Sequence, residues 1–118
     1  MHIMSRADLL DPQTVRAVRA FERKVAAHYD LAGVVLFGSR ARLSHRPDSD
    51  ADVAVLLHGP PGAFVATKLA LADLAYEVLL DTGIRVQPLP VWESEWAHPD
   101  EYPNPRLLRR IESEGIRL

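Results

Sequence analysis

Two short groups of residues carry the chemistry of this sequence, and each stands at one end of a hydrophobic run. Gly38 and Ser39 close the run over residues 34–37, and Asp50 and Asp52 open a second run. Short apolar runs bounded by polar turn residues are typical of buried strands. We therefore expect two rigid, neighbouring strands to bring a glycine-serine turn and two carboxylates into the same region.

The two aspartates are spaced so that they can bind one cation together. Residues at positions i and i+2 of a strand point to the same face, with Cα atoms about 6–7 Å apart. Asp50 and Asp52 offer only oxygen, and the sequence contains no cysteine. Oxygen ligands favour Mg²⁺ or Mn²⁺ over zinc, and Mg²⁺ commonly completes its shell with substrate phosphates. The pattern predicts a metal site at Asp50 and Asp52 with a phosphate-bearing ligand beside it.

The glycine-serine turn has the properties of a phosphate-binding turn. Gly38 permits a close approach of the backbone, and Ser39 offers a hydroxyl group and, if a short helix starts there, a favourable partial charge. Arg42 could contact a phosphate at two points through its guanidinium. In isolation, Gly38 would be a turn residue and Ser39 a helix cap. It is their combination with the two aspartates that indicates a site.

Composition indicates one globular domain that acts on a small charged ligand. The chain has 118 residues, of which 47% are hydrophobic and 25% charged, and its formal net charge is −2. Without a positive field, direct binding of a long nucleic acid is not expected. No segment approaches the roughly 18 apolar residues of a membrane helix. We expect a single cytoplasmic domain over residues 1–118 that makes no contact with a membrane.

Periodicity predicts three helices and three strands. Helices are expected over residues 12–29, 63–80 and 106–114, and strands over 34–37, 53–57 and 84–89. This order predicts an α+β domain of two layers, a small mixed β-sheet of three strands with helices packed on one face. The helix over 63–80 is apolar around most of its circumference, which predicts burial on more than one side.

A proline-rich segment separates the last expected strand from the short C-terminal helix over 106–114. Five prolines fall between residues 88 and 105, a density that predicts an extended surface segment rather than regular structure. Trp92 and Trp96 lie on this segment. They could anchor a partner protein, but packing against the sheet is the favoured interpretation.

Together, the two groups of residues resemble the signature of the minimal nucleotidyltransferases, small members of the DNA polymerase β superfamily. The resemblance rests on Gly38-Ser39-Arg40-Ala41-Arg42 and on the segment 46–55, and residues 104–118 also resemble the usual ending of these proteins. It implies a nucleotidyltransferase fold in which Gly38 and Ser39 bind the triphosphate of ATP and Arg42 contacts a phosphate. Asp50 and Asp52 would hold Mg²⁺ or Mn²⁺, and Ser39, Asp50 and Asp52 would form the catalytic set.

The resemblance also implies a biological setting. Members of this family are commonly encoded beside a HEPN-domain ribonuclease toxin, and several transfer AMP from ATP to a tyrosine of that toxin. The leading hypothesis is therefore a Mg²⁺-dependent adenylyltransferase that serves as an antitoxin for a HEPN-type partner. An alternative from another class is a binding module that neutralises its partner by occlusion. Transfer to a small molecule is less favoured, because the chain has no evident second domain to enclose one.

Two departures from the family pattern stand out. Full catalysts carry a third carboxylate on the later strand, where it is expected to share a metal and act as general base. On the expected strand over 84–89, the positions whose side chains would face the two aspartates are Arg85 and Gln87. Neither residue is acidic. Glu77 and Asp81 are acidic alternatives, although helix-surface and capping roles are favoured for both. Leu43 stands where the family often has glycine.

Three polar residues of the connecting loop have two interpretations each. His45 is either a solvated loop side chain or a nucleotide contact, with the solvated role favoured. Arg40 and Arg46 either neutralise phosphate or pair with Asp48.

Overall fold

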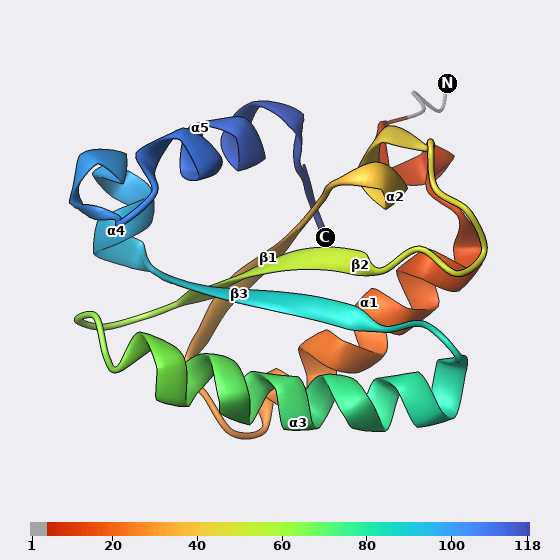
Figure 1. Cartoon of the computed structure of the whole chain (residues 1–118), viewed down its shortest axis with the longest axis horizontal. Coiled ribbons are helices and arrows are strands. Elements are labelled where there is room, and N and C mark those ends of the chain that lie inside the picture. Colours follow the sequence, from red (N-terminus) through yellow and green to blue (C-terminus); the bar gives the residue numbers. More distant parts are fainter. Residues whose placement is uncertain (1–4) are drawn as a thin grey trace.

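A mixed four-stranded sheet organises residues 5–118, the part of the chain that the computed structural model describes. The strands β1 (Leu31–Phe37), β2 (Ala51–Leu57), β3 (Val86–Trp92) and β4 (Ile116–Arg117) lie in the order β3-β2-β1-β4. β1 pairs antiparallel with both β2 and β4, whereas β2 and β3 are parallel (Figure 1). The three predicted strands are present, and the two-residue β4 adds a short fourth strand beside β1.

Two long helices cover one face of the sheet. After a short 3-10 turn, η1 (Ala7–Leu9), helix α1 (Pro12–Ala26) begins at the predicted position, because Asp11 caps its first turn and Pro12 suits it. Helix α3 (Phe64–Thr82) makes the crossover that a parallel pair of strands requires, and it ends at Gly83. Phe21 of α1 is fully buried between these helices and the sheet.

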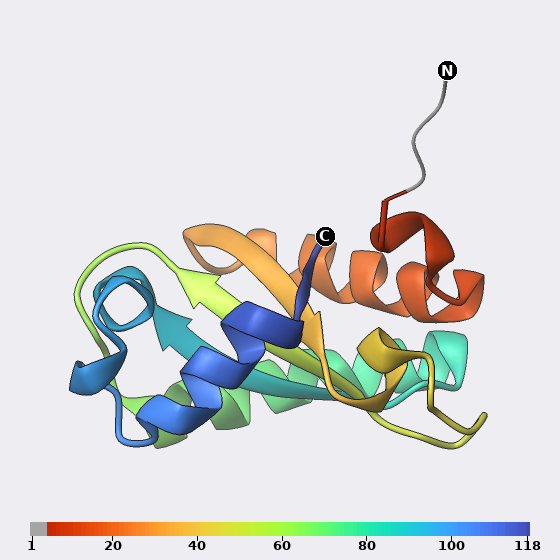
Figure 2. The ribbon, with the colours of Figure 1, turned by 90° about the horizontal axis from the view of Figure 1, so that it is seen from above.

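A third helix covers the opposite face, so the prediction of helices on one face is wrong. Helix α5 (Pro105–Glu114) lies across this face in Figure 2, and Leu108 and Ile111 pack there against β1 and β2. The physical reason is that β1 and β2 are apolar at consecutive positions, as in Val34-Val35-Leu36, so both of their faces must be buried.

The proline-rich segment is folded rather than extended, which corrects a second prediction. It forms helix α4 (Glu93–Ala97) and the 3-10 turn η2 (Pro99–Glu101) before α5 begins at Pro105. Pro99 and Pro105 stand at the first positions of η2 and α5, where a missing N–H costs no hydrogen bond. Trp92 and Tyr102 are buried, so the packing interpretation of Trp92 is confirmed.

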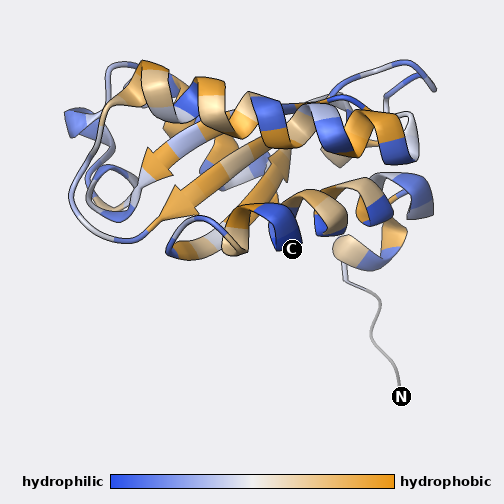
Figure 3. Ribbon diagram, turned by 90° about the horizontal axis from the view of Figure 1, so that it is seen from below, coloured by the Kyte–Doolittle hydropathy of each residue, from blue (hydrophilic) through white to orange (hydrophobic). Residues whose placement is uncertain are grey.

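Helix α3 is apolar on two sides, but only one of them is buried in the single chain. Leu71, Ala75 and Val78 face the sheet, whereas Val65, Leu69, Tyr76 and Leu80 are each 59–68% exposed on the outer side. Figure 3 views the molecule from the side of α3 and shows hydrophobic (orange) segments along this helix. The prediction that α3 is buried on more than one side is therefore wrong for this chain alone. Within residues 5–118, no helix is long and apolar enough to cross a membrane.

Candidate active site

The register of β1 and β2 brings the glycine-serine turn to the aspartates. Phe37, the last residue of β1, pairs with Asp52 of β2, so the next residue, Gly38, lies against the Asp52 side chain. A Cβ atom added to Gly38 would lie 2.2 Å from Oδ2 of Asp52. Ala54 packs on the α5 side of the sheet, and Asp52, two residues earlier in the same strand, points to that side as well. The two groups predicted to meet therefore lie in contact, at the edge of the face that α5 covers.

Gly38 adopts a conformation that favours glycine. Its φ is 75° and its ψ is −159°, a region that is strained for residues with a side chain. Its carbonyl oxygen accepts hydrogen bonds from the N–H groups of Ala41 and Arg42, which begins the short helix α2 (Ser39–Arg42). Among the described residues the Ser39 hydroxyl has no hydrogen-bond partner. A free donor and a glycine without a side chain make this turn accessible to a phosphate.

Leu43 ends helix α2 in a left-handed backbone conformation that glycine adopts more easily. It follows α2 with a φ of 61° and a ψ of 26°, in the left-handed region that glycine usually occupies after a helix. The departure from the family pattern at this position therefore changes the residue type but keeps a conformation suited to glycine.

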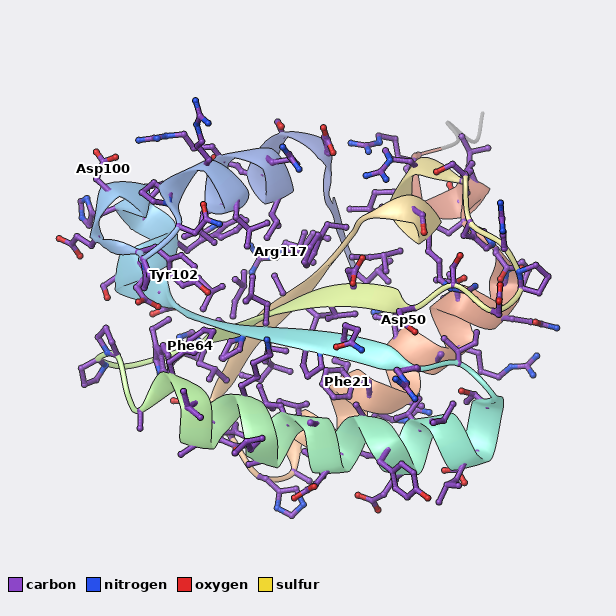
Figure 4. The ribbon with its side chains drawn as sticks, in the orientation of Figure 1. Phe21, Asp50, Phe64, Asp100, Tyr102 and Arg117 are labelled. Carbon is purple, nitrogen blue, oxygen red and sulfur yellow. The ribbon has the colours of Figure 1, made fainter. Side chains whose placement is uncertain are left out.

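The two carboxylates lie in an electrostatic environment that suits a cation. Burial raises the pKa of Asp52, and the neighbouring charge of Asp50 raises it further, while Arg42 acts in the opposite direction. Oδ2 of Asp50 accepts a hydrogen bond of 3.3 Å from Nε2 of Gln87. Asp50 lies immediately before β2 (Figure 4). A divalent ion would offset both the burial and the mutual repulsion, so the residues present fit Mg²⁺ or Mn²⁺.

Gln87 occupies the place that the family pattern gives to a third carboxylate. It pairs with Asp52 in the parallel register of β2 and β3 and contacts Asp50 directly. Glu77 does not substitute, because its Oε1 lies 3.7 Å from Nζ of Lys24 on the α1 side of the molecule. Within residues 5–118, no three acidic, histidine or cysteine side chains gather as a metal-binding group. The site therefore has two carboxylates and a neutral amide.

Arg40 has a structural role that sequence reasoning missed. Its side chain is 2% exposed and donates hydrogen bonds to the carbonyl oxygens of Ser49 and Pro47 and to the hydroxyl of Thr14. Its Nη1 lies 3.6 Å from Oδ2 of Asp11. Neither of the two predicted roles, phosphate neutralisation or pairing with Asp48, is compatible with this burial. Arg40 instead fastens the loop before Asp50 to the helix that follows Gly38.

Arg42, at the end of α2, and His45, in the following loop, lie in different surroundings. Arg42 is about half exposed, with Nη1 3.7 Å from Oε2 of Glu114, and its charge reaches Asp52. His45 is only 18% exposed and lies beside Asp11, 4.0 Å from its Oδ2, so the solvated interpretation of His45 is wrong. Arg42 thus remains near the candidate site, and His45 belongs with the structural cluster around Arg40.

A hollow of about 350 Å³ opens beside Asp52. Its apolar wall combines residues of β1, β3 and α5, and its polar groups come from Asp52, Gln87 and α3. The lining residues are Phe37, Asp52, Lys68, Gln87, Pro88, Leu89 and Leu107. Sequence reasoning missed Lys68 and Leu107, because each looks like an ordinary helix residue until the fold brings it to the site.

The fold and the paired aspartates are those of a nucleotidyltransferase, and comparison with known proteins agrees. The sequence model of the nucleotidyltransferase domain family matches residues 18–118, so the chain belongs to that family. Its structure is similar to the crystal structure of a Sulfolobus solfataricus protein assigned as a nucleotidyltransferase, with a TM-score of 0.56 and 19% identity. The match covers 99% of this chain and 89% of the other, and it confirms the nucleotidyltransferase fold. No curated protein gives a match to the chain.

The contact between Gly38 and Asp52 yields a first prediction. Gly38→Ala should cost about 1–3 kcal/mol from the positive φ and more from the clash with Asp52, and it should abolish Mg²⁺-dependent binding of ATP. Gly59→Ala is the matched control, because Gly59 also has a positive φ but nothing lies within 4 Å of its added Cβ. Thermal unfolding and calorimetric titration with ATP and Mg²⁺ measure both effects. Equal losses of binding in the two variants would contradict the role of this contact.

The environment of Asp52 yields a second prediction, about pH. Because the pKa of Asp52 is raised in the folded chain, ionised Asp52 lowers stability at neutral pH, and this penalty disappears as the pH falls through the folded-state pKa. Asp52→Asn should therefore raise the melting temperature in EDTA at pH 7, with a smaller gain at acidic pH. Added Mg²⁺ should stabilise only the unsubstituted chain.

The exposed Asp48 provides the control for this measurement. Asp48→Asn should leave the melting temperature unchanged at every pH. A lower melting temperature for Asp52→Asn than for the unsubstituted chain would show that Asp52 stabilises the fold without a cation, contrary to the prediction.

Proposed function

We propose that the chain is a Mg²⁺-dependent nucleotidyltransferase that transfers AMP from ATP to a hydroxyl group of a protein acceptor, with a HEPN-domain toxin as that acceptor. The observation that carries the proposal is the contact of the Gly38 turn with Asp52, beside Asp50 and the open hollow. Membership of the nucleotidyltransferase domain family supports transfer chemistry. The antitoxin role follows from the resemblance to the minimal nucleotidyltransferases.

In the proposed reaction, different residues of the site would bind the phosphates and the metal ion. The acceptor oxygen attacks the α-phosphorus of ATP, the bond from that phosphorus to the bridging oxygen breaks, pyrophosphate leaves, and the acceptor proton passes to water. Gly38 and Ser39 would hold the phosphates, with Arg42 as a further cationic contact. Asp50 and Asp52 would hold Mg²⁺, which when bound supplies neutralisation of the phosphate charge.

The hollow beside Asp52 favours a tyrosine as acceptor. Phe37, Leu89 and Leu107 give it apolar walls that suit an aromatic ring, and it opens directly at Asp52. A phenol has a pKa of about 10, so it needs a weaker base than an aliphatic alcohol to lose its proton. With Gln87 in place of a third carboxylate, a tyrosine hydroxyl is the protein acceptor that this site can use most readily.

Transfer of label tests the proposed activity. Incubation with ATP labelled at the α-phosphate, Mg²⁺ and the HEPN-domain product of a neighbouring gene should label that protein, and Asp50→Asn should abolish the labelling. Asp48→Asn is the matched control, since Asp48 lies in the same loop but is exposed, and it should retain the labelling. The absence of any label that depends on Asp50 would overturn the proposal.

Gln87 favours a second candidate function, a binding module that neutralises its partner by occlusion. An amide can contribute an oxygen ligand but cannot accept the proton of an acceptor as a carboxylate does. If the Asp50→Asn variant protects cells from the partner as well as the unsubstituted chain does, occlusion is the mechanism. If protection is lost with the labelling, occlusion is excluded.

Restoring the third carboxylate makes a further prediction. Gln87→Glu should raise the initial rate of label transfer about tenfold or more, because a positioned general base contributes at least that factor. Gln87→Asn keeps a neutral amide and serves as the control, with no gain expected. An unchanged rate for Gln87→Glu would mean that the proton of the acceptor is removed by another group.

A further inference from the structure

Lys68 is the one basic residue, among those that the structure describes, that lines the hollow beside Asp52. The chain contains only two lysines. The other, Lys24, lies on the α1 side with its Nζ 3.7 Å from Oε1 of Glu77. Among residues 5–118, Lys68 has neither an ion pair nor a hydrogen bond, and its side chain is exposed. Its ammonium group is therefore free to bind a group that enters the hollow.

Lys68 reaches the hollow past the free edge of the sheet. Helix α3 packs on the face opposite the hollow, and β3 is the outermost strand on this side. The N–H of Ala51 bonds to the carbonyl oxygen of Arg85, so the even-numbered residues of β3 direct their backbone groups to the free edge. Two of these, Pro88 and Pro90, have no N–H to donate. Another strand is therefore disfavoured at this edge, which leaves it open to a side chain of α3.

The ring of Phe64 positions the Lys68 ammonium group. Phe64 precedes Lys68 by one helical turn, and Nζ of Lys68 lies over its ring, 6.0 Å from the centroid. The ring packs edge-on against Tyr102, with the two ring centroids 6.4 Å apart (Figure 4). Tyr102 is buried in the core on the α5 side, against which the apolar walls of the hollow also pack. Lys68 thus rests on an aromatic contact that is anchored beside the hollow.

The charges at the hollow explain why a free cation is useful there. Asp52 lines the hollow, and the charges of Asp50 and Arg42 act on it. A hydroxyl group that loses its proton beside two carboxylates meets a repulsion that a bound Mg²⁺ offsets only in part. An opposite charge at about 4–6 Å lowers the pKa of an acid by about 1–3 units. Lys68 therefore favours the ionised form of an acidic hydroxyl group in the hollow.

The apolar walls select which anion fits beside Lys68. The walls are formed by Phe37, Leu89 and Leu107. A phosphate or a small carboxylate would use the ammonium group but leave these walls without a partner. A phenolate uses both, because its ring packs against the walls while its oxygen accepts a hydrogen bond from the ammonium group.

We propose that Lys68 binds the ionised hydroxyl group of the acceptor tyrosine, so that the tyrosine attacks as its phenolate. The phenol first gives its proton to water. The phenolate oxygen then forms the bond to the α-phosphorus of ATP, while the bond from that phosphorus to the bridging oxygen breaks and pyrophosphate leaves. This role in transfer rests on the proposed function, whereas the binding of a phenolate by Lys68 is measurable without transfer.

Ionisation of 4-nitrophenol tests the binding step, because the ionised form of this phenol is coloured. In the presence of the full chain and Mg²⁺, the bound probe should ionise about one pH unit lower with the unsubstituted chain than with Lys68→Met. Lys68→Arg keeps the charge and should keep the shift. Lys24→Met is the matched control and should also keep it. The charges of Asp50, Asp52 and Arg42 are common to all four proteins and cancel in the comparison.

A probe that does not bind, or a shift that persists in Lys68→Met, would overturn the proposal.

Label transfer to the protein acceptor tests the catalytic consequence. Lys68→Met should lower the rate at pH 7 about tenfold and move the rise of the rate with pH upward by about one unit, because less of the tyrosine is ionised at a given pH. Calorimetry should show an unchanged affinity for ATP with Mg²⁺. Lys68→Arg should keep most of the rate, and Lys24→Met all of it.

The outcomes separate this proposal from the proposed function. A loss of ATP affinity in Lys68→Met would assign Lys68 to the nucleotide, and an unchanged pH profile would make it a solvated surface residue; either result would overturn the proposal. If the unsubstituted chain transfers no label but Lys68 still lowers the pH at which the probe ionises, the proposed function fails and the phenolate site stands.

Discussion

The arrangement of the site depends on one buried cation, the guanidinium of Arg40. It is 2% exposed, and its hydrogen bonds reach the Ser49 and Pro47 carbonyls in one loop and the Thr14 hydroxyl in α1, which are two separate parts of the chain. Arg40 follows the glycine-serine turn by one residue, and its carbonyl acceptors lie just before Asp50. Because leaving a buried charge or its partners unpaired costs about 3–5 kcal/mol, these contacts hold the turn and the first aspartate in a fixed relation. The geometry of the candidate site, with its glycine-serine turn and two aspartates, is therefore maintained by a residue that belongs to neither group.

The site itself is unfavourable to the fold until a cation enters it. Asp52 is partly buried beside Asp50, and both effects raise its pKa. A third carboxylate at position 87 would add a further negative charge, whereas the amide of Gln87 donates a hydrogen bond to Asp50 and lessens the repulsion. The free site is thus spared a third negative charge, and under the proposed function this leaves it without a carboxylate that could act as general base. This exchange is consistent with an acceptor that already carries an acidic hydroxyl.

Local patterns in the sequence predicted most elements, and the joint spacing of residues 38–39 and 50–52 predicted which groups would meet. Long-range contacts were harder to predict. The burial of Arg40 has no sequence signature, because its acceptors are mainly backbone carbonyls. The prolines that predicted an extended segment stand at helix starts, where proline is tolerated. The sequence did contain the information that helices cover both faces of the sheet, because β1 and β2 are apolar at consecutive positions.

The sheet separates most of the candidate site from the exposed apolar side of α3, and Lys68 of α3 is the residue that reaches the hollow. Asp52 and the hollow lie on the face that α5 covers, whereas α3 packs on the opposite face with its exposed apolar side directed outward. Pro88 and Pro90 prevent strand pairing at the edge between the two faces.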